Sequence, residues 1–262
     1  MNNKVLPLTV ILLVKGREDF TERWLRYMSQ IQFPHKIIIA DGEDDGAVKN
    51  LLHQNNQGWP LDVKFYQFNT HGGFSQYFKM MQSAIAAAET KYVMLCDNDD
   101  FILPNSLIDI VNFLEKNQSY VSAGGKIVNF EIDNYNNVPY GKVVNFLKPY
   151  SYSRLDEPEE DFGLHIKSVF SNFQPNFYNI FRKETLETIA NELVEIDFSD
   201  LIAMEFFIQL RAATLGKSRV LSNHSHYLRQ RGTSQISTDY NFFENLLPVS
   251  YTHLTLPTKR IV

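Results

Sequence analysis

An apolar run that ends abruptly in three carboxylates stands at residues 91–104 of this chain. Tyr92–Cys96 is short and apolar at every position, and Asp97, Asp99 and Asp100 follow it at once. A strand that is apolar on both faces is typical of the buried centre of a parallel sheet, because helices cover both of its sides. Its carboxyl end then carries the three acidic side chains at the edge where open α/β sheets bind ligands.

Carboxylates spaced as Asp-x-Asp at such an edge predict a divalent cation that holds a phosphate group. Hard oxygen ligands suit Mg²⁺ or Mn²⁺. A second interpretation stays open, since acidic residues ahead of a helix that begins near Pro104 also stabilise the positive end of that helix. An EF-hand is excluded, because Ile102 occupies the place where the calcium loop needs glycine.

Composition limits the class of protein. With 262 residues, 44% of them hydrophobic, the chain can bury a sizeable core as one large domain or a domain with an appended lobe. A formal charge of −5 argues against a general nucleic-acid partner. The single cysteine excludes an internal disulfide and favours a reducing compartment. The apolar stretch Val5 to Val14 is too short to span a bilayer, so no transmembrane segment is predicted.

Strands and helices alternate in the first half of the chain. The pattern predicts strands at Pro7–Val14, Ile37–Ala40, Val63–Phe68 and Tyr92–Cys96, with helices at Phe20–Ile31, Val48–His53 and Phe74–Glu89 between them. Such alternation predicts a mostly parallel sheet covered on both faces.

Two further features of the first half suggest ligand contacts. Asp41 follows the second strand, where a carboxylate can accept hydrogen bonds from a ribose or a base, although a turn-forming Asp-Gly explains it equally well. The glycine pair that ends at Gly73 lets the backbone approach a ligand, or tightens the entry to the next helix. No G-x-G-x-x-G or Walker sequence is present.

The second half has a less regular pattern. We expect strands at Val121–Ile132, Asn172–Phe181 and Ser218–Ser222 and helices at Lys183–Leu193 and Asp200–Leu215, with irregular loops and short strands over residues 134–160 that form a variable binding surface. The helix that begins at Asp200 is apolar nearly all round and should be buried. Glu205 interrupts it, either as a functional carboxylate or as a buried one satisfied by Arg211 or by a backbone donor.

The segment from Asn223 to Gln235 concentrates histidine, arginine and hydroxyl residues. It contacts a diphosphate or a metal, or else it is a solvated basic loop. The final stretch, residues 249–262, resembles a translated sequencing-library adapter. We therefore expect it to be a non-native tail, with the natural chain cut near Pro248.

Together these motifs resemble the family-two glycosyltransferases of the GT-A fold. The matching residues are the aspartate after the second strand (Asp41), the Asp-x-Asp after the fourth (Asp97 and Asp99), a helix with Arg211 that ends in Leu215-Gly216-Lys217, and the segment Tyr227, Arg229, Gly232 and Ser234. The resemblance implies an α/β Rossmann-like fold with a mostly parallel central sheet flanked by helices and a smaller, mixed acceptor-side region. It also implies one domain over residues 1–248, with a nucleotide-sugar half at about 1–120 and an acceptor and catalytic half at about 121–248.

The resemblance also implies roles for residues. Asp41, Gly73, Asp97, Arg229 and Ser234 would bind the nucleotide sugar, and Asp99 would hold Mn²⁺ or Mg²⁺ with Asp97. Counting back from Leu215-Gly216-Lys217 puts Met204-Glu205 where the family has its Glu-Asp pair, so Glu205 is the favoured catalytic base. Asp200 is the competing placement.

The implied reaction is metal-dependent transfer of a sugar from a nucleotide-diphosphate sugar to an acceptor hydroxyl, with inversion. The acceptor would be a glycan or lipid-linked sugar in surface polysaccharide or glycan synthesis, and the location cytoplasmic, with peripheral association at the inner face of the membrane an option. Two alternatives remain: a sugar-1-phosphate nucleotidyltransferase, of whose cationic loop Lys15-Gly16-Arg17 is a poor hint, and a non-catalytic glycan- or nucleotide-binding module.

Overall fold

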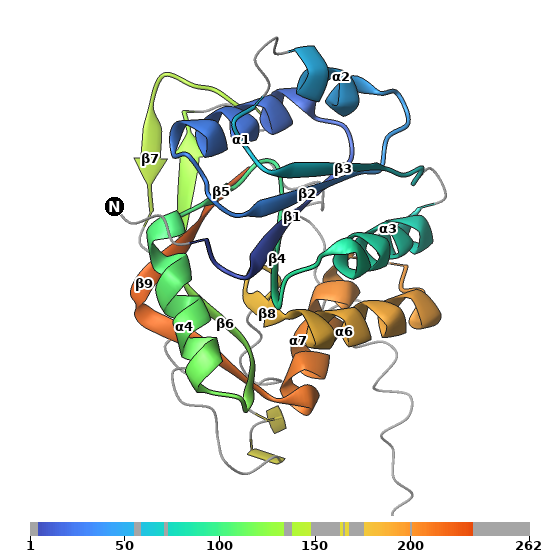
Figure 1. Ribbon diagram of the computed structural model, residues 1–262, viewed down its shortest axis with the longest axis vertical. Helices are drawn as coiled ribbons and strands as arrows, with labels where there is room; N and C mark the ends of the chain where they lie inside the picture. Colours follow the sequence, from blue (N-terminus) through green and yellow to red (C-terminus); the bar gives the residue numbers. More distant parts are fainter. Residues whose placement is uncertain are drawn as a thin grey trace, which may run out of the picture.

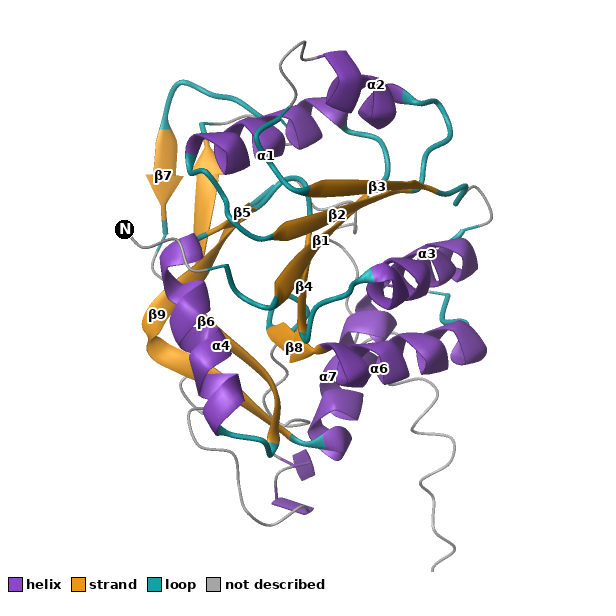
Figure 2. Ribbon diagram, in the orientation of Figure 1, coloured by secondary structure: helices purple, strands orange, loops and turns teal. Residues whose placement is uncertain are grey.

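One sheet organises the molecule. The computed structural model describes residues 5–54, 59–70, 73–133, 138–147, 163–164, 166–167, 176–199 and 201–232. Within them a sheet of nine strands has the order β3-β2-β1-β4-β8-β6-β9-β5, and β7 pairs with β6 off this path. Helices lie on both of its sides, which confirms the expected α/β class (Figures 1 and 2).

The first half forms the parallel part of the sheet. Its strands are β1 (Leu8–Val14), β2 (Lys36–Asp41), β3 (Val63–Gln67) and β4 (Tyr92–Cys96), and the connecting helices are α1 (Glu18–Gln30), α2 (Ala47–Gln54) and α3 (Phe74–Ala87). All residues of β1 are buried, and Leu12 pairs with Ile39 on one side and Cys96 on the other. Because these strands are parallel and in register, β2 and β4 present their acidic ends at the same edge.

The second half adds a mixed, partly antiparallel region. The short β8 (Ile180–Arg182) lies antiparallel between β4 and the long β6 (Tyr120–Ile132), while β9 (Lys217–Gln230) runs parallel to β6. The edge strands β5 (Phe101–Ile102) and β7 (Val144–Phe146) pair antiparallel with β9 and β6. The 3-10 helix η1 (Pro104–Ser106) leads into α4 (Leu107–Lys116), and α6 (Lys183–Ile196) precedes α7 (Leu201–Leu215).

One expected strand is longer than predicted. We expected it to end at Ser222, with a ligand-contacting segment or a solvated loop from Asn223, but β9 continues through Gln230 and pairs with β6, with irregularities in the register. A hydrogen-bonding partner distant in the sequence thus overrides a polar composition. The two strands approach closely at Gly125, where a Cβ atom would lie 2.6 Å from the backbone oxygen of His224. Only glycine fits that approach.

Other expectations were partly wrong or fall outside the description. Of the strand expected over Asn172–Phe181, residues 172–175 lie outside the described residues, residues 177–179 form a turn and a bend, and β8 begins only at Ile180; β5 was not expected. The predicted adapter tail at residues 249–262 lies outside the described residues. Across the described ranges, no helix combines the length and apolar character needed to cross a membrane.

Arg182, the last residue of β8, connects three other elements. The residue is 5% exposed, and its guanidinium donates to the backbone oxygens of Leu114 (2.6 Å), Asn117 (3.2 Å) and Tyr120, the last through Nε at 2.8 Å. It also donates to the hydroxyl of Tyr92 at 3.3 Å. One side chain therefore satisfies the end of α4, the start of β6 and a residue of β4.

Arg182→Met should lower the free energy of unfolding by about 3 kcal/mol or more, because several buried acceptors lose their donor at once. Urea denaturation followed by circular dichroism measures the change. Arg26→Met is the matched control, since Arg26 is exposed and pairs only with Glu22 on its own helix. Equal midpoints for the two variants would contradict the structural role of Arg182.

Candidate active site

A cavity of about 370 Å³ opens at the carboxyl ends of β1 and β4. It is bounded by the acidic turn after β4, the beginnings of α3 and α7, and the end of β9. The residues that line it are Leu13, Val14, Lys15, Arg17, Gly73, Phe74, Tyr77, Asp97, Asn98, Asp99, Asp100, Phe177, Tyr178, Leu201, Met204, Glu205, Arg229 and Gln230. Residues from both halves of the chain therefore meet around one space of ligand size.

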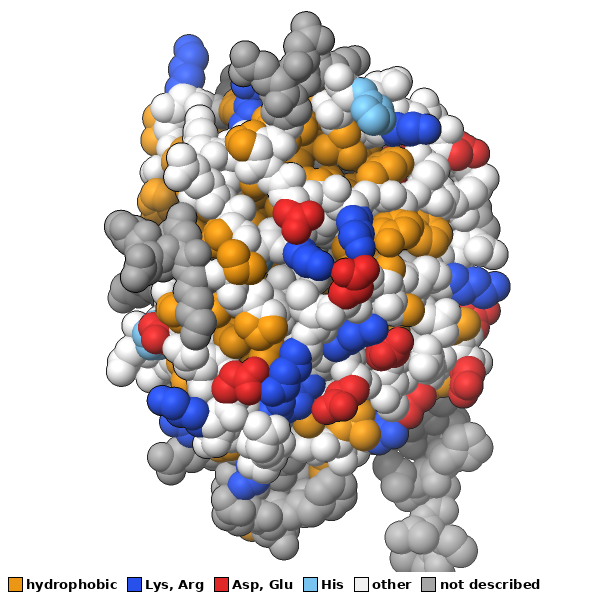
Figure 3. All heavy atoms as spheres, viewed as in Figure 1, with side chains coloured by type: hydrophobic (Ala, Val, Ile, Leu, Met, Phe, Trp, Pro, Cys, Tyr) orange, Lys and Arg blue, Asp and Glu red, His pale blue; other side chains and the backbone are white. Residues whose placement is uncertain are grey.

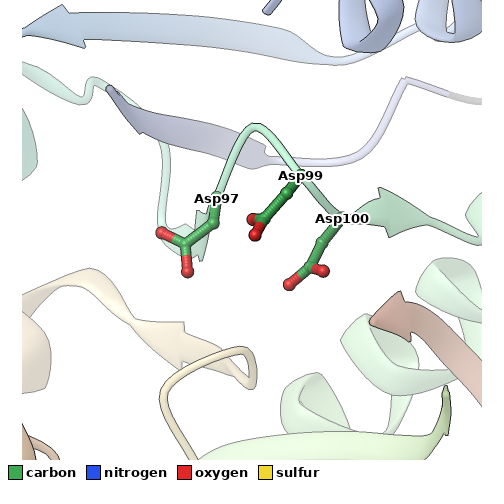
Figure 4. A group of neighbouring side chains, drawn as sticks. All are labelled: Asp97, Asp99 and Asp100. Carbon is green, nitrogen blue, oxygen red and sulfur yellow. The ribbon is translucent and has the colours of Figure 1, made fainter. Parts of the chain in front are cut away.

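The acidic turn gathers three carboxylates. Asp97, Asp99 and Asp100 each have a ligand atom within 4.8 Å of the others, and their side chains project to one side of the turn (Figure 4). Asn98 connects the turn to α1, because its Nδ2 donates to Thr21 Oγ1 at 3.0 Å. The turn is thereby held against the beginning of α1, with its carboxylates facing the cavity.

A buried arginine fixes the same turn to the second half of the chain. Arg23 donates to the backbone oxygen of Asp99 at 2.6 Å, to Gln230 Oε1 at 2.6 Å and to the backbone oxygen of Pro139 at 2.7 Å. The backbone N–H of Gln230 in turn donates to Asp100 Oδ1 at 2.8 Å. Burial lowers the pKa of Arg23 to about 10, which still leaves it charged at neutral pH.

Burial and repulsion between neighbouring carboxylates make the ionised forms of Asp97 and Asp100 less favourable than those of ordinary aspartates. Burial, and next the negative charge of Asp99, raises the pKa of Asp97 to about 7, while a hydrogen bond from Tyr178 and the charge of Arg229 act in the opposite direction. The Tyr178 hydroxyl donates to Asp97 Oδ2 at 2.7 Å. Burial also raises the pKa of Asp100 well above its ordinary value. A bound cation would stabilise the ionised forms of all three.

The donor set suits a hard divalent cation. Three carboxylates that line the cavity offer oxygen ligands, as Mg²⁺ and Mn²⁺ require. The residues present therefore fit the expected metal, which Asp97 and Asp99 would hold with Asp100 beside them.

Three cationic side chains line the cavity with the carboxylates: Lys15, Arg17 and Arg229. Burial by itself lowers the pKa of Arg229, but the surrounding acidic groups more than reverse this, so its pKa is raised overall. Lys15 Nζ donates to the backbone oxygen of Thr70 at 3.2 Å. This mixture of fixed charges is suited to a ligand that carries both a metal and a diphosphate.

Glu205 enters the cavity from α7. Among the described residues its carboxylate makes no hydrogen bond or ion pair; burial raises its pKa, and the charge of Arg229 acts against this rise. The alternative in which Arg211 pairs with Glu205 is wrong, because Arg211 donates to both oxygens of Glu192, at 2.7 and 2.8 Å. A half-buried carboxylate that has a raised pKa, lines a cavity and has no cation in contact among the described residues is a candidate general base.

The predicted site residues have three outcomes. Gly73, Asp97, Asp99, Glu205 and Arg229 lie together around the cavity. Asp41 does not line it; it is fully buried at the end of β2, where its Oδ1 accepts from the backbone N–H of Glu43 at 3.1 Å, and burial raises its pKa. Asp200 and Ser234 lie outside the described residues.

Other residues of the site carried no clear sequence signal. Tyr178 stands in a segment expected to be strand, and Arg23 lies in an ordinary amphipathic helix. Arg17 was weighed only as part of a loop for nucleotidyl transfer. All three act through partners more than 75 positions away in the sequence.

The comparison with known families decides the assignment. The model described as "Glycosyl transferase family 2" matches residues 9–189, which is more than half of the chain. The chain belongs to glycosyl transferase family 2. No curated protein matched the sequence.

Solved structures agree in fold with this family member. TarS of S. aureus, residues 1–349, has a TM-score of 0.57 and 20% identity, over 85% of this chain and 60% of that one. The same fragment in complex with UDP-GlcNAc has a TM-score of 0.58 and 19% identity, over 95% of this chain and 67% of that one. The mannosyltransferase PcManGT from Pyrobaculum calidifontis, in complex with GDP-Man and Mn²⁺, has a TM-score of 0.52 and 13% identity, over 90% of this chain and 59% of that one.

Proposed function

We propose that this family-two protein transfers a sugar from a nucleotide-diphosphate sugar to an acceptor hydroxyl, with inversion, in a reaction that depends on Mn²⁺ or Mg²⁺. The observation that carries the proposal is that one cavity joins a cluster of three aspartates, three cationic side chains and the half-buried Glu205. Two structural neighbours support it, because they are complexes with UDP-GlcNAc and with GDP-Man and Mn²⁺.

In this mechanism the acidic and basic side chains divide the work. Asp97 and Asp99 would hold the cation, which would supply positive charge to neutralise the diphosphate leaving group. Arg229 adds positive charge on the same side, so the bond from the anomeric carbon to the diphosphate oxygen breaks more easily. Glu205 accepts the proton of the acceptor hydroxyl as that oxygen attacks the anomeric carbon from the opposite face. A single displacement of this kind inverts the anomeric centre.

The apolar part of the cavity would limit hydrolysis. Phe74, Tyr77, Phe177, Leu201 and Met204 line it together with the charged groups. Apolar walls exclude water that would otherwise compete with the acceptor hydroxyl. These walls also suit the apolar faces of sugar rings.

The remaining assignments extend this proposal. Gly73 and Ser234 belong to nucleotide-sugar binding. Asp41 keeps that role only if ligand entry exposes it, because in this structure it is fully buried and outside the cavity lining. Asp200 remains the alternative base. Residues 1–120 form the donor half and 121–248 the acceptor half of one domain, with 249–262 as a non-native tail. The acceptor is a glycan or lipid-linked sugar of surface polysaccharide synthesis, on the cytoplasmic side and in peripheral contact with the membrane.

A donor panel tests the proposal directly. A thermal-shift assay compares the melting temperature of the protein with UDP or with GDP, each with and without Mn²⁺. We expect one of the two nucleotides, together with Mn²⁺, to raise the melting temperature. The sugar nucleotides of that base should then release the nucleoside diphosphate when acceptor glycans are added. Release of pyrophosphate from a nucleoside triphosphate and a sugar 1-phosphate would instead indicate a nucleotidyltransferase. Binding without any turnover would indicate a binding module.

A further inference from the structure

Arg17 has an unusual backbone at the wall of the cavity. Gly16 and Arg17 have φ angles of 64° and 63°, so two successive residues lie in the left-handed region before α1 begins. Glycine adopts this conformation freely, but for arginine it costs on the order of 1 kcal/mol. Strain of this kind persists where the surroundings fix it, and here it places a guanidinium in the cavity.

The guanidinium is held by an acidic partner and an aromatic face. Nη1 and Nη2 both lie 3.3 Å from Asp99 Oδ2, and the guanidinium carbon is 4.1 Å from the centre of the Phe20 ring. Nε is buried and makes no hydrogen bond among the described residues. Both terminal nitrogens of Arg17 therefore donate to the same oxygen, and not all of the N–H donors of its guanidinium are used.

That oxygen belongs to the carboxylate assigned to the metal. A divalent cation at Asp99 and a guanidinium on the same oxygen repel each other strongly at these distances. Asp99 cannot bind both positive groups as strongly as it binds either one alone. A bound cation therefore weakens the ion pair between Asp99 and Arg17. A diphosphate offers the released guanidinium a better partner, because phosphate oxygens match its fork.

We propose that Arg17 moves from Asp99 to the diphosphate when the metal and the nucleotide enter together. This inference rests on the proposed function and adds a donor-binding residue to it. Arg17 opposes binding of the cation alone and favours binding of the cation with a diphosphate. It thereby couples the two ligands, since each raises the affinity of the site for the other.

The test compares wild type with Arg17→Gln in two binding measurements. Mn²⁺ alone, followed by loss of its free electron-paramagnetic-resonance signal, should bind the variant about threefold tighter or more, because a competing charge has gone. Mn²⁺ with UDP or GDP, whichever nucleotide wild type binds, should bind the variant roughly tenfold weaker by calorimetry, because a charged hydrogen-bond donor has gone. A purely structural role would weaken both.

Two further variants complete the design. Arg17→Lys keeps the charge without the fork, so it should bind Mn²⁺ alone as wild type does and still bind the Mn²⁺–nucleotide more weakly. Arg26 is an exposed arginine of α1, the helix that follows Arg17, so Arg26→Gln should change neither measurement.

The outcomes separate this inference from the proposed function. Metal-dependent nucleotide binding in wild type that is unchanged in Arg17→Gln overturns the role of Arg17 and leaves the function standing. Weaker binding of Mn²⁺ alone by that variant also overturns it, since Arg17 would then support the metal site. Wild-type protein that binds neither nucleotide with Mn²⁺ overturns the proposed function and the inference together.

Discussion

Glu205→Gln is expected to lower the rate of sugar transfer by on the order of 10²-fold or more, while affinity for the donor stays nearly unchanged. Glutamine keeps the size of the side chain and removes the group that accepts the hydroxyl proton. Single-turnover measurements with saturating donor report the chemical step, and calorimetry with the nucleoside diphosphate reports binding. Glu195→Gln, which changes an exposed carboxylate on α6, is the matched control.

The pH dependence gives the same prediction a second measurement. Burial raises the pKa of Glu205 above its ordinary value, although the charge of Arg229 acts against this. A base works only when it is deprotonated, so transfer should fall on the acid side at a pH above that of an ordinary glutamate. Normal turnover by Glu205→Gln, together with collapse in Asp200→Asn, would move the role of base to Asp200.

Asp99→Asn is expected to abolish metal-dependent nucleotide binding. Loss of a group that hydrogen-bonds to a metal ligand commonly lowers metal affinity 10- to 100-fold. Replacement of a charged ligand itself should therefore lower it about 100-fold or more. Calorimetry with the nucleoside diphosphate and Mn²⁺, repeated with a chelator, measures the loss. Asp109→Asn changes an exposed aspartate of α4 and should leave affinity unchanged.

This variant should lose binding without losing stability. The charge of Asp99 is one of the causes that raise the pKa of Asp97, so its removal relieves repulsion in the folded state. The same change removes the ion pair between Arg17 and Asp99, so the two effects oppose each other and the melting temperature without ligand should stay near that of wild type. Affinity that is unchanged, with or without chelator, would contradict the assignment of the metal to Asp99.

The surface offers little help in finding the site. On the face shown in Figure 3, acidic and basic side chains are interspersed. Exposed ion pairs occur at the surface, for example those of Glu89 with Lys36 and Lys64. Such pairs contribute little to stability. The informative charges are the buried ones, which gather at the end of β4.

Hydrophobic pattern predicted the parallel half of the sheet well. The strand at Tyr92–Cys96 was expected with the bounds that the structure has, because a run that is apolar on both faces has few alternatives to a buried strand. The same pattern placed Asp97 and Asp99 at a ligand-binding edge. It failed for residues 223–230, where polar composition indicated a loop although pairing with β6 makes them a strand.

The sequence by itself therefore determined the α/β class, the acidic edge after β4 and the position of Glu205 in a mostly apolar helix, although that helix is half-buried rather than buried as expected. Only the tertiary structure decided the partners of these groups. Arg17 donates to Asp99, the hydroxyl of Tyr178 donates to Asp97, and Arg211 donates to Glu192 rather than to Glu205. The physical reason is range. Apolar periodicity reports how each segment is covered, whereas a contact between distant residues depends on which strands pair and in what register, and no local pattern contains that information.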